Sequence, residues 1–109
     1  IALVGCAKLP LDNGAPSAPV LSASPSPGSY NVPITVTVDD PDGDMVTLRF
    51  RATPTSGSVQ DFTWTSFIFS GEEATFYLNL SYGQWTIEAK AKDELEEESP
   101  WSSLTINVS

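Results

Sequence analysis

The stretch from Trp85 to Lys92, WTIEAKAK, alternates apolar and polar side chains without interruption. Successive side chains of a β-strand point to opposite faces of the sheet, so a period of two predicts a strand with one buried face and one solvated face. The same alternation recurs over residues 34–39, 46–52, 75–80 and 104–108. No segment keeps the period of an amphipathic helix for more than one turn. We therefore expect an all-β chain.

The aromatic segment 61–69 changes phase in the middle, because Phe62 and Trp64 share one parity whereas Phe67 and Phe69 share the other. A β-bulge, or a break into two short strands near residues 65 and 66, accounts for such a slip. We count this segment as one strand and add an edge strand over 20–24, between prolines. The total is about seven short strands, which predicts an antiparallel immunoglobulin-like sandwich.

Size and composition suit one small domain and exclude several kinds of chemistry. The chain has 109 residues and a net charge of -9, which argues against binding to nucleic acid or to anionic lipid. It has no His and one Cys, so it lacks a Ser-His-Asp or Cys-His nucleophile, a His-ligated transition metal and an internal disulfide. Short loops on a small sandwich form no deep cleft for paired catalytic carboxylates. We expect no enzyme activity.

The first residues carry a second signal. Leu3-Val4-Gly5-Cys6 resembles the lipobox of bacterial lipoprotein precursors, in which the signal peptide is cut before the cysteine and the cysteine receives the lipid. The resemblance implies that residues 1–5 are the tail of a signal peptide and that the protein is exported and lipid-anchored in the bacterial cell envelope. It touches the membrane only through the lipid on Cys6. The alternative is that residues 2–5 form part of a first strand with Cys6 buried.

Residues 6–19 are rich in Pro, Ser and Ala, a composition typical of a tether or stalk, and residues 20–109 then form the domain. Two segments of this domain, LSYGQWTIEAKAKD at 80–93 and SPWSSL at 99–104, resemble the last two strands of bacterial fibronectin type III-like domains. FTWT at 62–65 is similar to their tryptophan segment, and the three-tyrosine domain of bacterial sensor proteins is a near relative. The chain departs from the pattern at Trp85, where Tyr is usual, and at 94–98, where Gly-Asn usually stands.

Such domains are mostly spacers and binding modules, so the resemblance implies a non-catalytic spacer or protein-interaction module. Its partner would be another protein or a component of the cell envelope. Carbohydrate binding is the main alternative, with Trp64, Tyr77 and Tyr82 as the exposed aromatic candidates. Trp85 lies on the apolar parity of its strand and is expected in the core. A more remote alternative is a fragment of a larger extracellular enzyme.

The topology gathers the acidic residues. Antiparallel strands place loops 39–44, 70–73 and 93–100 at one end of the sandwich, and these loops hold eleven of the fourteen acids. Carboxylates at alternate positions suit calcium, a hard cation that takes oxygen ligands. The candidate ligands are Asp39, Asp40, Asp42, Asp44, Asp93 and Glu94. The motif is not an EF-hand, and Asp-Pro-Asp-Gly is also a favourable turn sequence, so a weak calcium site and a solvated turn both stay open. We expect no other cofactor.

Four of the five basic residues, in contrast, point outward from two strands that should be neighbours: Arg49, Arg51, Lys90 and Lys92. One outer sheet face should therefore carry a basic patch. It serves either as cross-strand charge balance and edge protection or as a docking surface.

Overall fold

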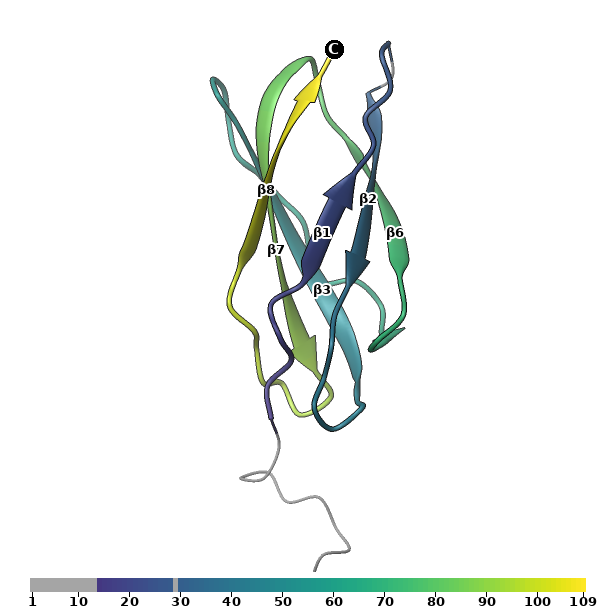
Figure 1. Cartoon of the computed structure of the whole chain (residues 1–109). Helices are drawn as coiled ribbons and strands as arrows, with labels where there is room; N and C mark the ends of the chain where they lie inside the picture. The colour runs from purple at the N-terminus through teal and green to yellow at the C-terminus, as the bar shows by residue number, and fades with distance from the viewer. Residues whose placement is uncertain (1–13, 29) are drawn as a thin grey trace, which may run out of the picture.

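The computed structural model describes residues 14–28 and 30–109, and within these ranges it contains eight strands and no helix (Figure 1). Their bounds are β1 Val20–Ala23, β2 Asn31–Thr37, β3 Met45–Pro54, β4 Gln60–Asp61, β5 Ile68–Phe69, β6 Ala74–Asn79, β7 Gly83–Asp93 and β8 Ser102–Val108. All pairings are antiparallel. A three-stranded sheet, β1-β2-β6, faces a second sheet of order β4-β3-β7-β8, in which β5 also pairs with β3. The predicted all-β antiparallel sandwich is confirmed.

The apolar positions of the alternating stretches form the core between the sheets. Ile34 on β2, Leu48 on β3 and Ile87 on β7 are fully buried, because each points toward the opposite sheet. Trp85 belongs to this core, as predicted, and its indole N–H donates to the carbonyl oxygen of Ser81 at 2.9 Å. Burial of apolar surface on both inner faces is the main force that holds the two sheets together.

The phase slip corresponds to a real interruption of the strand. Residues 62–67 have no regular structure, and the short strands β4 and β5 on either side both pair with β3. Between them, Thr65 donates its N–H to the carbonyl of Leu48 at 2.8 Å, and the N–H of Leu48 donates to Thr65 Oγ1 at 2.9 Å. The count is eight strands instead of about seven because this segment forms two.

The predicted edge strand is present as β1, and the residues before it pack on the sandwich. Pro16 and Pro19 are buried, and Ser17 donates its N–H to the carbonyl of Asp39 at 2.8 Å. Ser102 Oγ donates to the carbonyl of Pro19. The packed part of the chain therefore includes residues 14–19, which we expected to belong to the tether. The signal-peptide tail, Cys6 and the rest of the tether lie outside the described residues.

The described chain starts at one pole of the sandwich and leaves at the other (Figure 1). The β2–β3, β5–β6 and β7–β8 loops gather at the pole where residue 14 lies, and Gly71 N–H donates to the carbonyl of Val38 at 2.7 Å there. At the other pole, Gly28 N–H donates to the carbonyl of Ser109 at 2.7 Å. The three acidic loops thus share one end, as predicted; we call it the acidic pole. Among the described residues, no helix has the length and hydropathy needed to cross a membrane.

Candidate functional site

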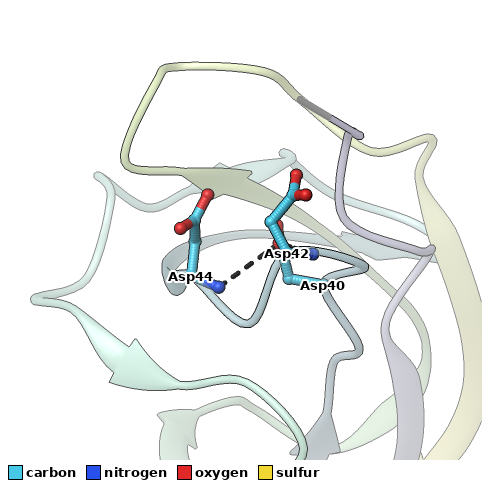
Figure 2. A group of neighbouring side chains, drawn as sticks. All are labelled: Asp40, Asp42 and Asp44. Carbon is cyan, nitrogen blue, oxygen red and sulfur yellow. Dashed lines mark hydrogen bonds between the residues drawn. The ribbon is translucent and has the colours of Figure 1, made fainter. Parts of the chain in front are cut away.

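The β2–β3 loop holds three aspartates close together at the acidic pole (Figure 2). Asp40 Oδ1 accepts the N–H groups of Asp42 at 2.8 Å and Asp44 at 3.3 Å, and Gly43 N–H donates to the carbonyl of Asp40 at 2.9 Å. Gly43 has a φ of 72°, which a residue without Cβ adopts at little cost. The Asp-Pro-Asp-Gly turn therefore forms as its residue types predict, and this turn brings the carboxylates together.

One ligand oxygen from each of Asp40, Asp42 and Asp44 lies within 4.8 Å of the other two. Oxygens around a single Ca²⁺ lie roughly 2.3–2.6 Å from the ion, so three oxygens at this spacing can share one cation. Asp40 Oδ2 is buried and has no hydrogen-bond partner among the residues that the structure describes. Asp42 Oδ2 accepts the N–H of Gly14 at 2.8 Å, which ties the segment before β1 to this loop.

The other three candidate calcium ligands lie outside this cluster. Asp93 is buried, and its Oδ1 accepts the N–H groups of Leu95 and Glu97, both at 2.9 Å. Glu94 Oε2 accepts the N–H of Met45 at 3.3 Å, beside Asp44 in the chain. Asp39 is exposed. Asp93 and Glu94 thus hold the β7–β8 loop and connect it to the start of β3.

The structure brings the four predicted basic residues onto one face. In the β3–β7 pairing, Arg49 lies opposite Lys90, Thr47 opposite Lys92 and Arg51 opposite Glu88. The face also carries acidic partners, because three of the cations form ion pairs: Arg51 Nε to Glu88 Oε1 at 2.9 Å, Lys90 Nζ to Glu98 Oε1 at 2.6 Å and Arg49 Nη2 to Asp61 Oδ1 at 4.0 Å. The Lys90 ammonium lowers the pKa of Glu98, and the carboxylate of Glu88 raises the pKa of Arg51. These pairs favour cross-strand charge balance over a free basic docking surface.

Two tryptophans lie over this face, an arrangement that alternation does not predict. Lys92 Nζ lies 4.4 Å from the ring centre of Trp64, and Arg51 Cζ lies 4.4 Å from that of Trp101. Lys90 lies between the two rings, 5.7 Å from Trp64 and 4.9 Å from Trp101. Cations at such distances are attracted to the ring face. The signal that the sequence offered is that each Trp stands in a connection outside the alternating stretches, between β4 and β5 for Trp64 and between β7 and β8 for Trp101.

The three aromatic candidates for carbohydrate contact do not share one surface. Trp64 and Tyr77 line a cavity of about 300 Å³ together with Phe50, Phe62, Phe76 and Leu78. Tyr82 lies elsewhere, in the β6–β7 turn, with its ring centre 4.8 Å from that of Tyr30. A hydrogen bond between these two tyrosines raises the pKa of Tyr30. The cavity is therefore the one place in the described part of the chain where two of the candidates meet.

The two packed antiparallel sheets and their order define an immunoglobulin-like β-sandwich. The chain is similar to the solved PKD domain of an M14-like peptidase from Thermoplasmatales archaeon SCGC AB-540-F20, with 29% identity, a TM-score of 0.67, and coverage of 88% of this chain and 97% of that one. The PKD1 domain of Vibrio anguillarum Epp also matches, with 16% identity, a TM-score of 0.46, and coverage of 84% and 94%. No family model and no curated protein matches the sequence.

Proposed function

We propose that this domain is a non-catalytic module of the cell envelope that acts as a spacer or a protein-interaction domain. The observation that carries the proposal is the placement of residue 14 and Ser109 at opposite poles (Figure 1). Such a sandwich holds whatever is joined to its two ends about one domain length apart. The likeness to a PKD domain that belongs to a peptidase supports a role as an attached module.

The separation of the two poles tests the spacer role directly. Fluorescent dyes on cysteines placed at Ala15 and Ser109, in a Cys6→Ser background, should give one narrow distance distribution that denaturant abolishes in a single transition. A control pair at Ala15 and Glu96, both at the acidic pole, should give a shorter distance. A broad distribution for the first pair, or one no longer than the control, would contradict a rigid spacer.

We extend the proposal to location: the protein is exported and carries a lipid on Cys6. The lipobox resemblance of Leu3-Val4-Gly5-Cys6 supports it. Mass spectrometry of the protein made from its full gene in a bacterial host should show cleavage before Cys6 and the added mass of a lipid. The Cys6→Ser variant should stay uncleaved and unlipidated. An uncleaved, unmodified Cys6 in the unaltered protein would refute the anchor.

A weak calcium site at the acidic pole is the second candidate function. The approach of the Asp40, Asp42 and Asp44 carboxylates to within 4.8 Å favours it, together with the unpartnered Asp40 Oδ2. Bound calcium would offset the repulsion between these carboxylates and stiffen the β2–β3 loop. The test is the calcium dependence of stability described in the Discussion.

A further inference from the structure

Strand β6 has one side that no other described strand pairs with. It lies at the edge of the three-stranded sheet and pairs only with β2. Pro33 lies opposite Tyr77 in this pairing, and its carbonyl accepts the N–H of Ser24 on the β1 side at 3.3 Å. Pro33 therefore directs its backbone groups toward β1 and not toward β6. Because hydrogen-bonded pairs alternate along an antiparallel ladder, Thr75, Tyr77 and Asn79 turn their N–H and C=O groups away from β2, to the open edge.

The residues of β6 themselves give this edge little protection against pairing with another chain. The sequence of β6, ATFYLN, contains no charge, no Pro and no Gly. The other edge of this sheet, β1, is flanked by Pro19 and Pro25, and the segments on either side of it are held beside β8 through Ser102 to Pro19 and Gly28 to Ser109. An extended segment that adds a strand to this sheet would therefore form its hydrogen bonds with the open edge of β6.

The cavity of about 300 Å³ lies beside the same edge. Phe76 and Leu78, on the inward parity of β6, line it from one side, and Phe62 and Trp64, in the connection between β4 and β5, line it from the other. A strand added to β6 continues the pleat of the sheet, so its inward side chains would lie next to Phe76 and Leu78. Ligand pockets span roughly 300–1,000 Å³, and this volume at the lower end suits one apolar side chain better than an oligosaccharide.

Charge decides between a second copy and a different partner. Glu72 and Glu73 are exposed and immediately precede β6. The chain has a net charge of -9, so a second copy docked at this edge would be repelled by the overall charge of the first. A partner with Lys or Arg beside its apolar residue would instead neutralise Glu72 and Glu73.

We propose that an extended segment of a partner protein binds as an added strand on β6, placing an apolar side chain in the cavity and a basic side chain near Glu72 and Glu73. This inference rests on the proposed role as a protein-interaction module and identifies the surface and the kind of partner. The hydrogen bonds to Thr75, Tyr77 and Asn79 would supply the register, and the cavity would select the side chain.

The probes are heptapeptides acetyl-Lys-Thr-X-Thr-X-Thr-Lys-amide, in which X is Phe, Tyr, Leu, Ile or Val in all combinations. The strongest binder, found by titration against the ¹⁵N-labelled chain, should shift the amide signals of Thr75, Tyr77 and Asn79 and slow their hydrogen exchange. The amides of Phe76 and Leu78 should keep their exchange rates, because they already bond to β2. A matched peptide with Pro at its central position should not bind, because Pro lacks the N–H that a ladder needs.

Two kinds of variant separate the contribution of the backbone hydrogen bonds from that of the Glu72 and Glu73 charges. Thr75→Pro removes one N–H from the open edge and should weaken the best peptide roughly tenfold, the upper range for loss of one hydrogen bond. The exposed pair Glu72→Lys and Glu73→Lys should weaken it severalfold at low salt, whereas the matched pair Glu96→Lys and Glu97→Lys on the β7–β8 loop should change it less than twofold.

Several results would overturn the proposal: no peptide of the set protecting these three amides, protection appearing at β1 or β4 instead, or full affinity in both sets of variants. A concentration-dependent dimer that protects the same amides without peptide would assign the edge to a second copy. Chitotetraose shifting Trp64 and Tyr77 where no peptide does would assign the cavity to a glycan. None of these results alters the distance between the poles, so the spacer role is judged separately.

Discussion

Ser99 shows how a single polar side chain fixes the loop that follows β7. It is only 6% exposed, and its hydroxyl accepts the N–H of Ala91 and donates to the carbonyl of Pro100, both at 2.9 Å. Its own N–H donates to the carbonyl of Ala91 at 2.8 Å. The loop therefore closes back onto β7 through two hydrogen bonds to Ala91, and Trp101 over the charged face follows two residues later.

Replacing Ser99 by Ala should leave the N–H of Ala91 buried without a partner. We expect a loss of about 1–3 kcal/mol in the free energy of unfolding, since a buried unsatisfied donor costs its full desolvation. Urea denaturation followed by tryptophan fluorescence measures it. Ser103→Ala, at an exposed position of β8, is the control and should change stability by less than about 0.5 kcal/mol. Equal effects for the two variants would contradict the role given to the Ser99 hydroxyl.

Glu98 gives a pH-dependent prediction. Its pKa lies below the ordinary value of 4.5 in the folded state because Lys90 donates to it. A lowered folded-state pKa means that the ion pair stabilises the fold above the ordinary Glu pKa and that this contribution disappears as the pH falls through the lowered value. The Glu98 side chain is 43% exposed, so solvent screens the pair and Glu98→Gln should cost no more than about 0.5 kcal/mol at pH 7.

Unfolding curves of the two proteins should therefore differ slightly at pH 7 and coincide near pH 3. The control is Glu96→Gln, an exposed acid of the same loop, and this variant should not lower the stability at pH 7. If the difference in unfolding free energy between the Glu98 variant and the unaltered protein grows as the pH falls, the predicted direction is wrong.

At the scale of the element, the β2–β3 loop carries the calcium proposal. If the dissociation constant lies near 1 mM, as in extracellular modules, about 10 mM CaCl₂ should stabilise the fold by about 1.4 kcal/mol and raise Tm by several degrees. Asp42→Asn should abolish the rise, because it removes one of the three clustered carboxylates. Asp39→Asn makes the same change of charge outside the cluster, and this variant should still show the rise in Tm with calcium.

The measurement is a thermal melt with CaCl₂, with the same concentration of MgCl₂, and with chelator. Magnesium should raise Tm less, because it gives up its water reluctantly and demands a stricter geometry. If calcium, magnesium and the Asp39 and Asp42 variants all give equal shifts, the effect is general screening of charge and the loop is simply a turn.

The molecule as a whole separates its charges in space. Acidic residues crowd one pole, whereas the cations of β3 and β7 are paired with carboxylates or lie over Trp64 and Trp101. Repulsion at the acidic pole is therefore the larger uncompensated electrostatic effect on folding. The acidic pole is also the end of the sandwich where the described chain begins.

Salt should therefore stabilise the protein. Raising NaCl from about 10 mM to 500 mM shortens the screening length from about 30 Å to less than about 8 Å, and we expect Tm to rise by a few degrees. Replacing Glu96 and Glu97 together by Gln should raise Tm at low salt and reduce the salt effect. A fall of Tm with salt would mean that the ion pairs on the β3–β7 face outweigh the repulsion.

Much of this architecture was predictable because a period of two reports directly on burial. Alternation alone places Ile34, Leu48 and Ile87 on the buried faces of their strands, where the structure has them, and the slip between Trp64 and Phe67 marks the interruption between β4 and β5. The packing of residues 14–19 was not predictable, because a Pro-rich composition indicates a tether whether or not the segment packs against a domain. The hydrogen bonds of Ser17 to Asp39 and of Gly14 to Asp42 are contacts between distant positions that no local pattern records.

The sequence by itself determined the class of fold and the position of the acidic pole, because both follow from alternation and from the antiparallel course of the chain. The strand order of an immunoglobulin-like sheet then made neighbours of the strands that carry Arg49 and Lys90. Only the tertiary structure decided which groups meet. It joined Asp40, Asp42 and Asp44 while directing Asp93 to its own loop, and it laid Trp64 and Trp101 over the cations. It also left the edge of β6 open beside a cavity. These outcomes depend on loop geometry and on side-chain packing between segments far apart in the chain, which a periodic pattern does not encode.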